Sequence, residues 1–207
     1  MTKMAKAPAA KIDFRKLYPD LYRESRDVAE VRAARGVFLT VDGVGKPGGP
    51  AFQAAIGALY ALAYTAKFTL KQAGLGDFAV PALEGLYFDD PATTPSAQWR
   101  WRLQIRIPDQ VTARALAGVR KTLAEKKGLD TRSVKRVAWA EGRALQVLHV
   151  GPYDQAGGAY QRLASEATAR GLSCAGPGHE VYLSDPRRVP PGRIKTIVRM
   201  PVRAARA

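Results

Sequence analysis

The 207-residue sequence contains a single cysteine, Cys174, and only two histidines, His149 and His179. One thiol cannot form an internal disulfide, so the sequence predicts a protein of the reducing cytoplasm. So few nitrogen and sulfur ligands argue against a zinc site built from four protein side chains. No glycine-rich phosphate loop, dinucleotide fingerprint or nucleophile elbow is present either. We therefore expect neither a metal nor another cofactor.

Long apolar runs and acidic residues are also scarce. No stretch of about 18 apolar residues exists, and residues 1–10 lack the apolar core of a secretory signal, so we expect no association with a membrane. The 18 acidic residues face 33 lysines and arginines, which gives a net charge of +15. Such a charge suits a polyanionic partner, but the basic residues are spread along the chain and no DNA-binding motif is present, which argues against nucleic acid. We interpret the charge as a solvated surface, with a protein- or nucleic-acid-interaction module as an alternative.

One order of elements occurs twice along the chain. The first set comprises a strand at 37–44, a helix at 51–72 and strands at 78–88 and 98–107; the second comprises a strand at 145–151, a helix at 156–170 and strands at 178–186 and 193–201. One such strand–helix–strand–strand unit leaves a hydrophobic face exposed, so we expect the two to pair. We assign 11–202 to one domain with halves at about 36–108 and 137–202, a linker helix at 110–127, and tails at 1–10 and 203–207.

The strand at 98–107 has the clearest alternation in the sequence. Its apolar series is Trp99, Trp101, Leu103, Ile105 and Ile107, and its polar series is Arg100, Arg102, Gln104 and Arg106. A period of two predicts an antiparallel strand with one buried face and one solvated face. We therefore expect the polar series to point outward.

A carboxylate lies beside a phenol in the last third of the chain. If 178–186 is a strand, Glu180 and Tyr182 share one face, while His179, Val181 and Leu183 share the other. The second set is largely apolar and should face the core. The first places an acid and a phenol together, a pair that is costly to bury without a partner.

The first half contains a related stretch around Glu84 and Tyr87. Aligning the Asp-Pro pairs that follow both stretches superimposes Tyr87 on Tyr182 but leaves Glu84 one residue out of register with Glu180. Either a bulge near Gly85 re-aims Glu84, or only one of the two acids faces a cleft between the halves. Both acids and both tyrosines are candidate ligand-binding residues.

Four other aromatic residues are candidates for the lining of this cleft. Tyr60 and Tyr64 lie one turn apart on the helix at 51–72 and share one stripe, with core packing as the alternative. Trp101 lies near the beginning of the strand at 98–107. Tyr153 follows a Gly-Pro pair and either caps the next helix or lines the cleft.

Several motifs together resemble the GyrI-like small-molecule-binding family. They are HVGPYD at 149–154, HEVYLSDPRR at 179–188 and KTIVR at 195–199, supported by ALAYTAKF at 61–68 and LEGL at 83–86. The resemblance runs from about residue 11 to 202. It implies an α+β fold of two SHS2-type units related by a pseudo-two-fold axis, with an antiparallel sheet, helices on one face and a central ligand cleft. It also places the carboxylate typical of the family at Glu180.

The resemblance implies binding of bulky aromatic, often cationic, xenobiotics. A subgroup of similar length is known to hydrolyse cyclopropane-bearing DNA-alkylating natural products; membership would make Glu180 the activator of a water molecule and Tyr182 the group that polarises a carbonyl. The chain departs from the subgroup pattern at 87–88, 156–158 and 178–179. For Glu180 the alternative is a structural ion pair with Arg100 or Arg102. The sequence leaves the ligand, turnover and oligomeric state open.

Overall fold

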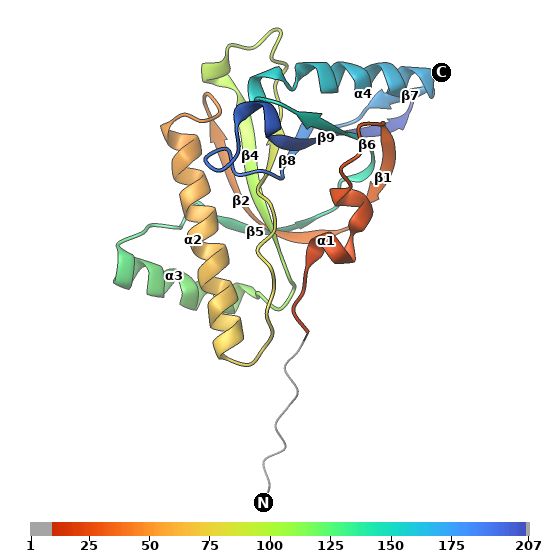
Figure 1. The fold of residues 1–207 in the computed structure, drawn as a ribbon. Coiled ribbons are helices and arrows are strands. Elements are labelled where there is room, and N and C mark those ends of the chain that lie inside the picture. The colour runs from red at the N-terminus through yellow and green to blue at the C-terminus, as the bar shows by residue number, and fades with distance from the viewer. Residues whose placement is uncertain (1–9, 206–207) are drawn as a thin grey trace, which may run out of the picture.

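The structure, a computed structural model, describes residues 10–205 and contains one nine-stranded sheet flanked by helices (Figure 1). The elements are α1 (Phe14–Leu17), β1 (Ala29–Ala33), β2 (Gly36–Val44), α2 (Pro50–Gln72), β3 (Glu84–Tyr87), β4 (Arg100–Ile107), α3 (Ala113–Lys127), β5 (Lys135–Trp139), β6 (Gly142–Val150), α4 (Gly157–Ala169), β7 (Leu172–Cys174), β8 (Gly178–Tyr182) and β9 (Lys195–Ala204). A 3₁₀ turn at Pro19–Tyr22 follows α1.

The sheet contains the repeated unit that the sequence predicts. The first unit is β2-α2-β3-β4 and the second is β6-α4-β8-β9, with β7 added beside β9. The central strand order is β6-β9-β8-β3-β4-β2, so the units form a pseudo-two-fold pair that meets where β8 lies antiparallel to β3. This confirms the predicted α+β fold with an antiparallel sheet.

Helices α2 and α4 pack on the same face of the sheet, which we call the helical face. Phe52 of α2 packs edge-on against Trp101 of β4, with ring centroids 5.0 Å apart. Leu163 of α4 packs in a cluster with Val147 and Val198. Leu103 of β4, Gly85 of β3, Glu180 of β8 and Val198 of β9 are successive cross-strand neighbours and share one face of the sheet. The packing areas of α2 and α4 therefore lie on the same side. The opposite side of the sheet is called the inner face below.

The strands that precede the two units are exchanged between them. β1 leads into β2 but pairs with β6, while β5 leads into β6 but pairs with β2. The last pair of the β1–β6 ladder is Ala33↔Gly142, and the first pair of the β2–β5 ladder is Gly36↔Trp139. Both ladders therefore have the same antiparallel register. Residues 29–40 and 135–146 thus form one long antiparallel ribbon that connects the two ends of the sheet. The ribbon encloses the inner face together with α1 and the 3₁₀ turn.

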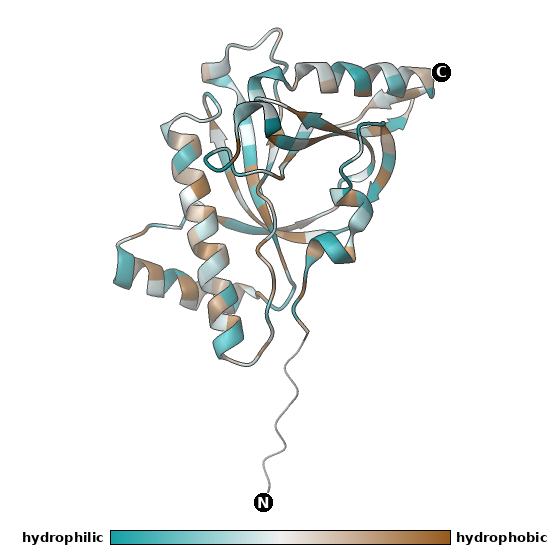
Figure 2. Cartoon of the chain, in the orientation of Figure 1, coloured by the Kyte–Doolittle hydropathy of each residue, from teal (hydrophilic) through white to brown (hydrophobic). Residues whose placement is uncertain are grey.

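The helices begin and end where the sequence provides signals. Pro50 occupies the first turn of α2, and Gly74 adopts a left-handed φ of +67° just after its end. α3 begins later than expected because the Thr112 side chain accepts a hydrogen bond from the Ala115 N–H at 3.2 Å and caps the helix there. Figure 2 shows hydrophobic and hydrophilic residues alternating along α2 and α3, and the buried residues of each helix recur at the spacing of an amphipathic helix.

The prediction that the polar series of β4 points to solvent is wrong for its second half. Gln104 is 0% and Arg106 is 5% exposed. Both lie on the inner face, which the ribbon and the N-terminal arm cover at this end of the strand. Arg100, at the other end, is exposed. Alternation therefore identified the two faces of β4 correctly but not the burial of the second one.

Two strand boundaries also differ from the sequence-based expectation. The strand expected at 78–88 is restricted to β3, and Phe78 instead forms a parallel bridge with Ile12 of the N-terminal arm. β9 continues into the expected basic tail because β7 offers backbone partners up to the Leu172↔Ala204 pair. Of the expected N-terminal tail, residues 1–9 lie outside the described residues.

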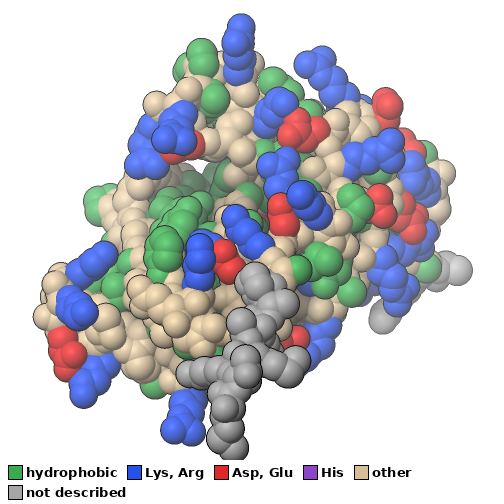
Figure 3. All heavy atoms as spheres, turned by 60° about the horizontal axis from the view of Figure 1, so that its bottom comes forward, with side chains coloured by type: hydrophobic (Ala, Val, Ile, Leu, Met, Phe, Trp, Pro, Cys, Tyr) green, Lys and Arg blue, Asp and Glu red, His purple; other side chains and the backbone are tan. Residues whose placement is uncertain are grey.

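Basic side chains are distributed widely over the surface. Figure 3 shows Lys and Arg across the whole face that it displays, with Asp and Glu between them and hydrophobic side chains around a hollow. Many of the arginines pair with acids, as Arg143 does with Glu30 at 2.7 Å. Within residues 10–205, no helix combines the length and apolar character that a membrane span requires.

Candidate functional site

Glu180 lies in β8 on the helical face, directly across from Gly85 of β3. Its side chain is buried, with 8% of its surface exposed. Tyr182 follows on the same face of β8. A Cβ atom at position 85 would lie 2.8 Å from the Tyr182 hydroxyl, so the absence of a side chain there allows Tyr182 to lie across β3.

Tyr160 reaches Glu180 from helix α4. Its hydroxyl donates a hydrogen bond to Glu180 Oε1 at 3.2 Å. The ring lies directly over Gly178, where a Cβ atom would come within 2.7 Å of it. A second glycine in the sheet thus provides the space for a second phenol beside the carboxylate.

Two further tyrosines complete the surroundings of Glu180. The hydroxyls of Tyr87 and Tyr182 lie 2.5 Å apart and share a hydrogen bond. The Tyr153 ring packs edge-to-face on Tyr182 with centroids 5.3 Å apart, and Trp99 packs edge-on against Tyr87 at 6.4 Å. The tyrosine cluster, as we call it, consists of Tyr87, Tyr153, Tyr160 and Tyr182.

Burial governs the protonation of this site. It raises the pKa of the Glu180 carboxyl above its usual value, and the nearby hydroxyls of Tyr182 and Tyr160 offset only part of the rise. Burial, together with the charge of Glu180, also raises the pKa of Tyr87 and Tyr153. The phenols therefore stay protonated at neutral pH and can donate hydrogen bonds.

The ion pair between Glu180 and an arginine of β4 does not form. Arg100 pairs with Asp89 at 2.7 Å, and Arg102 pairs with Asp42 at 2.6 Å. Within residues 10–205, the ion pairs of the structure include none with Glu180. Its side chain instead accepts a hydrogen bond from the Tyr160 hydroxyl, and the Tyr182 hydroxyl lies nearby.

Three further candidates lie on the helical face: Tyr60 and Tyr64 on α2, and Trp101, which is the cross-strand neighbour of Tyr87. Tyr60 and Tyr64 stack on α2 with ring centroids 6.1 Å apart, and Tyr64 is exposed. Trp101 is buried beneath α2, where its Nε1 donates a hydrogen bond to the carbonyl oxygen of Gly45 at 3.1 Å. Trp101 is therefore a core residue in this structure.

Glu84 lies on the inner face, opposite to the tyrosine cluster. β3 is regular, without a bulge at Gly85, so Glu84 points away from Tyr87. Its Oε2 accepts hydrogen bonds from Gln104 Nε2 at 2.7 Å and from His179 Nε2 at 3.2 Å. Of the two arrangements that the sequence allows, the structure has the one in which a single acid lies beside the tyrosines.

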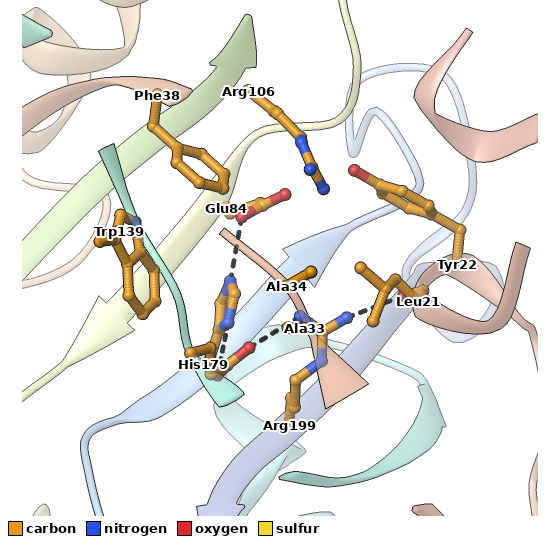
Figure 4. A pocket seen from close by; sticks show the side chains of 11 residues that line it. Leu21, Tyr22, Ala33, Ala34, Phe38, Glu84, Arg106, Trp139, His179 and Arg199 are labelled. Atoms are coloured by element: carbon orange, nitrogen blue, oxygen red, sulfur yellow. Dashed lines mark hydrogen bonds and ion pairs between the residues drawn. The ribbon is translucent and has the colours of Figure 1, made fainter. Parts of the chain in front are cut away.

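His179 connects Glu84 to a second buried acid. Its Nδ1 donates a hydrogen bond to Glu141 Oε1 at 2.9 Å, and Arg199 Nη1 donates one to Glu141 Oε2 at 2.9 Å (Figure 4). These four residues together with Gln104 form what we call the inner-face network. His179 therefore lies on a buried polar face rather than on the apolar one that its strand neighbours suggest.

Opposite charges fix the protonation of the inner-face network. Burial favours a neutral His179, but the adjacent carboxylates of Glu141 and Glu84 outweigh it and raise the His179 pKa to about 9. Burial likewise favours a neutral Glu141, but His179 and Arg199 outweigh it and lower the Glu141 pKa to about 2. The network is ionised across the neutral range.

Sequence reasoning missed several residues of both sites. Helical periodicity places Tyr160 on the apolar face of its helix, which predicts a core residue. The one sign of a role in the site is its hydroxyl, a polar group among alanines and leucines. The alternation of its strand predicts that Trp99 faces the core, but it does not indicate a place for Trp99 beside the tyrosine cluster. The ribbon brings Glu141 to His179, and β9 brings Arg199 to Glu141. Because these contacts join distant segments, no local sequence pattern identifies the two residues.

Comparisons with known proteins agree with this architecture. A family model described as "GyrI-like small molecule binding domain" matches residues 35–203. An uncharacterized conserved protein from Listeria innocua is 35% identical, with a TM-score of 0.88 over 93% of this chain and 100% of that one. A hydrolase from Listeria innocua is 36% identical, with a TM-score of 0.85 over 93% and 100% of the two chains. No curated protein matches the chain.

A more distant match shows the fold alone. The EcmrR structure in its complex with DNA is 14% identical and has a TM-score of 0.56 over 93% of this chain and 63% of that one. The family model covers most of the chain and includes both repeated units. The chain therefore belongs to the GyrI-like small-molecule-binding domain family.

Proposed function

We propose that this protein binds bulky aromatic small molecules, cationic or planar xenobiotics, at the tyrosine cluster, with Glu180 as the charge partner of the ligand. One observation carries the proposal: the Glu180 carboxyl is buried among four phenol rings, and no lysine or arginine of residues 10–205 pairs with it. Burial of an unpaired carboxylate is costly. A cationic ligand supplies the missing charge.

The rings around Glu180 suit ligands of this class. A cation over an aromatic face gains about 0.5–2 kcal/mol, depending on how far it is desolvated. Tyr153 and Tyr182 stand at 78° to each other, so the cluster presents ring faces in more than one direction. Stacking on such faces does not demand one pattern of donors and acceptors, which favours broad specificity.

Access to the carboxylate requires a side chain to move. Glu180 is almost fully buried, whereas Tyr153, Tyr160 and Tyr182 are partly exposed. An aromatic ligand can first contact the exposed ring edges. Tyr160, held to Glu180 by one hydrogen bond of 3.2 Å, then turns aside and lets the cationic group reach the carboxylate.

A titration with rhodamine 6G, a planar aromatic cation, tests this proposal by fluorescence anisotropy. We expect saturable binding to the wild type and a loss of about tenfold in affinity for Glu180→Gln, since tenfold corresponds to about 1.4 kcal/mol. The glutamine keeps the shape and removes the charge. Equal affinity of the two proteins for the dye contradicts the proposal.

A second candidate function is hydrolysis of cyclopropane-bearing alkylating agents. Two observations favour it: the 36% identical relative from Listeria innocua is named a hydrolase, and the raised pKa of Glu180 suits a general base. Glu180 would take a proton from a water molecule, whose oxygen forms a bond to a cyclopropane carbon. The broken carbon–carbon bond gives its electron pair to the conjugated carbonyl, which a tyrosine hydroxyl polarises.

Mass spectrometry separates the two candidates. Hydrolysis converts a cyclopropane-bearing compound into a product heavier by one water, and in ¹⁸O-labelled water the product carries the label. Glu180→Gln should abolish this conversion. Recovery of the unchanged compound from a wild-type protein that binds it leaves binding as the function.

A further inference from the structure

A pocket lies on the inner face, on the other side of the sheet from the tyrosine cluster (Figure 4). The 3₁₀ turn, the end of β1, β2, β3, β4 and β8 all contribute to its wall. Within it, the centre of a water molecule can move through about 20 Å³. The space that a water molecule fills is larger than the space open to its centre, and roughly 10–15 Å³ of filled space holds one water, so there is room for a water or a small ion.

The charges around the pocket do not balance. Both ring nitrogens of His179 lie within hydrogen-bond distance of carboxylate oxygens, at 2.9 and 3.2 Å, and only an imidazolium has a proton for each. Each guanidinium nitrogen of Arg199 donates one hydrogen bond: Nη1 to Glu141, Nε to Gln146 at 3.0 Å and Nη2 to the carbonyl of Leu21 at 2.8 Å. His179 and Arg199 thus neutralise the two glutamates of the network.

Arg106 is a third cation on this face, and no acidic residue in the described part of the chain pairs with it. Its side chain is buried, and none of the ion pairs or hydrogen bonds within residues 10–205 involves its guanidinium. The guanidinium instead lies over the ring of Tyr18 at 4.0 Å and near Phe14 and Phe38. Gly36 provides room for it, since a Cβ there would lie 3.0 Å from three guanidinium atoms.

Three polar groups converge on the pocket. Figure 4 shows the guanidinium of Arg106, the hydroxyl of Tyr22 and one carboxylate oxygen of Glu84 pointing toward one another. Glu84 uses its Oε2 for both Gln104 and His179, which leaves Oε1 for the pocket. Arg106 and Tyr22 can donate hydrogen bonds there, and Oε1 can accept one.

We propose that this pocket binds a small planar monovalent oxyanion that carries a proton, the class to which hydrogencarbonate belongs. The anion balances the charge of Arg106, whose fork of donors matches two oxygens of a planar oxyanion. The Tyr22 hydroxyl donates a further hydrogen bond. The anion keeps its proton and donates it in a hydrogen bond to Glu84 Oε1, which would otherwise repel a negative charge.

The comparison of hydrogencarbonate with nitrate tests the proposal. The two ions share charge, planarity and approximate size, but only hydrogencarbonate has a proton to donate. At mildly alkaline pH and constant ionic strength, we expect hydrogencarbonate to raise the melting temperature of the full chain saturably and to bind at least about tenfold more tightly than nitrate in calorimetry. Equal effects of the two ions, or none, overturn the proposal and leave a pocket that holds water.

Two variants keep the test independent of folding. Arg106→Gln should lower hydrogencarbonate affinity by at least about tenfold, and Tyr22→Phe, which keeps the ring, by about threefold. Arg132→Gln, at an exposed arginine paired with Asp130, is the matched control and should bind like the wild type. Wild-type affinity in a folded Tyr22→Phe or Arg106→Gln protein overturns the assignment of the site.

Discussion

Glu84 and Glu180 lie on neighbouring strands and point to opposite faces of the same sheet. Glu180 is paired across the ladder with Gly85, whereas Glu84 is paired with Val181, and this difference of one residue separates them. On the helical face, Glu180 lies among phenols, and no lysine or arginine in the described part of the chain pairs with it. On the inner face, Glu84 is held by His179 and Gln104.

This arrangement makes the two acids a matched pair for mutation. Glu180→Gln and Glu84→Gln are the same chemical change on two faces. We expect Glu180→Gln to weaken rhodamine 6G binding about tenfold, and Glu84→Gln to leave the affinity within about twofold. Glu84→Gln should instead lower the free energy of unfolding by about 1–3 kcal/mol, since it weakens buried hydrogen bonds to a charged group. The reverse pattern in anisotropy and urea unfolding refutes the assignment of faces.

Binding of a permanent cation should depend on the protonation of Glu180. Its pKa lies above the ordinary value of 4.5, and the protonated carboxyl has no charge to offer. Affinity for rhodamine 6G should therefore decrease as the pH falls through this raised pKa. The Glu180→Gln protein provides the control, because its weaker affinity should be independent of pH over the same range. Parallel profiles for the two proteins would show that another group titrates.

His179 should make the stability of the fold dependent on pH. Its pKa is about 9 in the folded protein and 6.5 in its reference state, so folding favours the imidazolium. The resulting contribution, on the order of 3 kcal/mol, is complete below pH 6.5 and is lost as the pH rises through about 9. Urea unfolding between these values should show a steady fall in the free energy of unfolding. A flat profile in the wild type contradicts the network described here.

Gly178 should be intolerant of a side chain. A Cβ atom there would lie 2.7 Å from the ring of Tyr160, so Gly178→Ala should displace that ring from Glu180. We expect a loss of about 1–3 kcal/mol in stability from the overpacked contact, together with weaker dye binding. Gly118→Ala, in an open part of α3, serves as the control, since nothing lies within 4 Å of the added atom. Unchanged dye affinity in Gly178→Ala would show that the position of Tyr160 does not matter.

The sequence predicted the local features of the fold well. Alternation in β4, the apolar stripe of α2 and the repeated order of elements all depend on residues close together in the chain. The placement of Glu180 with Tyr182 also follows from strand periodicity alone. Tyr87 joins them because the two units meet at β3 and β8, which the repeat suggested.

The parts that escaped prediction depend on contacts between distant segments. β1 and β5 change places between the units, and the resulting ribbon and the N-terminal arm, whose Tyr18 ring lies under the Arg106 guanidinium, together bury Gln104 and Arg106. In the sequence, both residues look like the solvent side of an amphipathic strand. Glu141 lies at the junction of β5 and β6 in that ribbon, so its pairing with His179 has no local signature.

The most direct test of the proposed site is an NMR spectrum of protein labelled with ¹³C in its tyrosine rings. The chain has eight tyrosines, of which Tyr18 and Tyr22 belong to the inner face. On addition of rhodamine 6G, we predict that the ring signals of the tyrosine cluster shift while those of Tyr18 and Tyr22 stay in place. Shifts confined to Tyr18 and Tyr22, or no shift under conditions where the dye binds, would contradict the account.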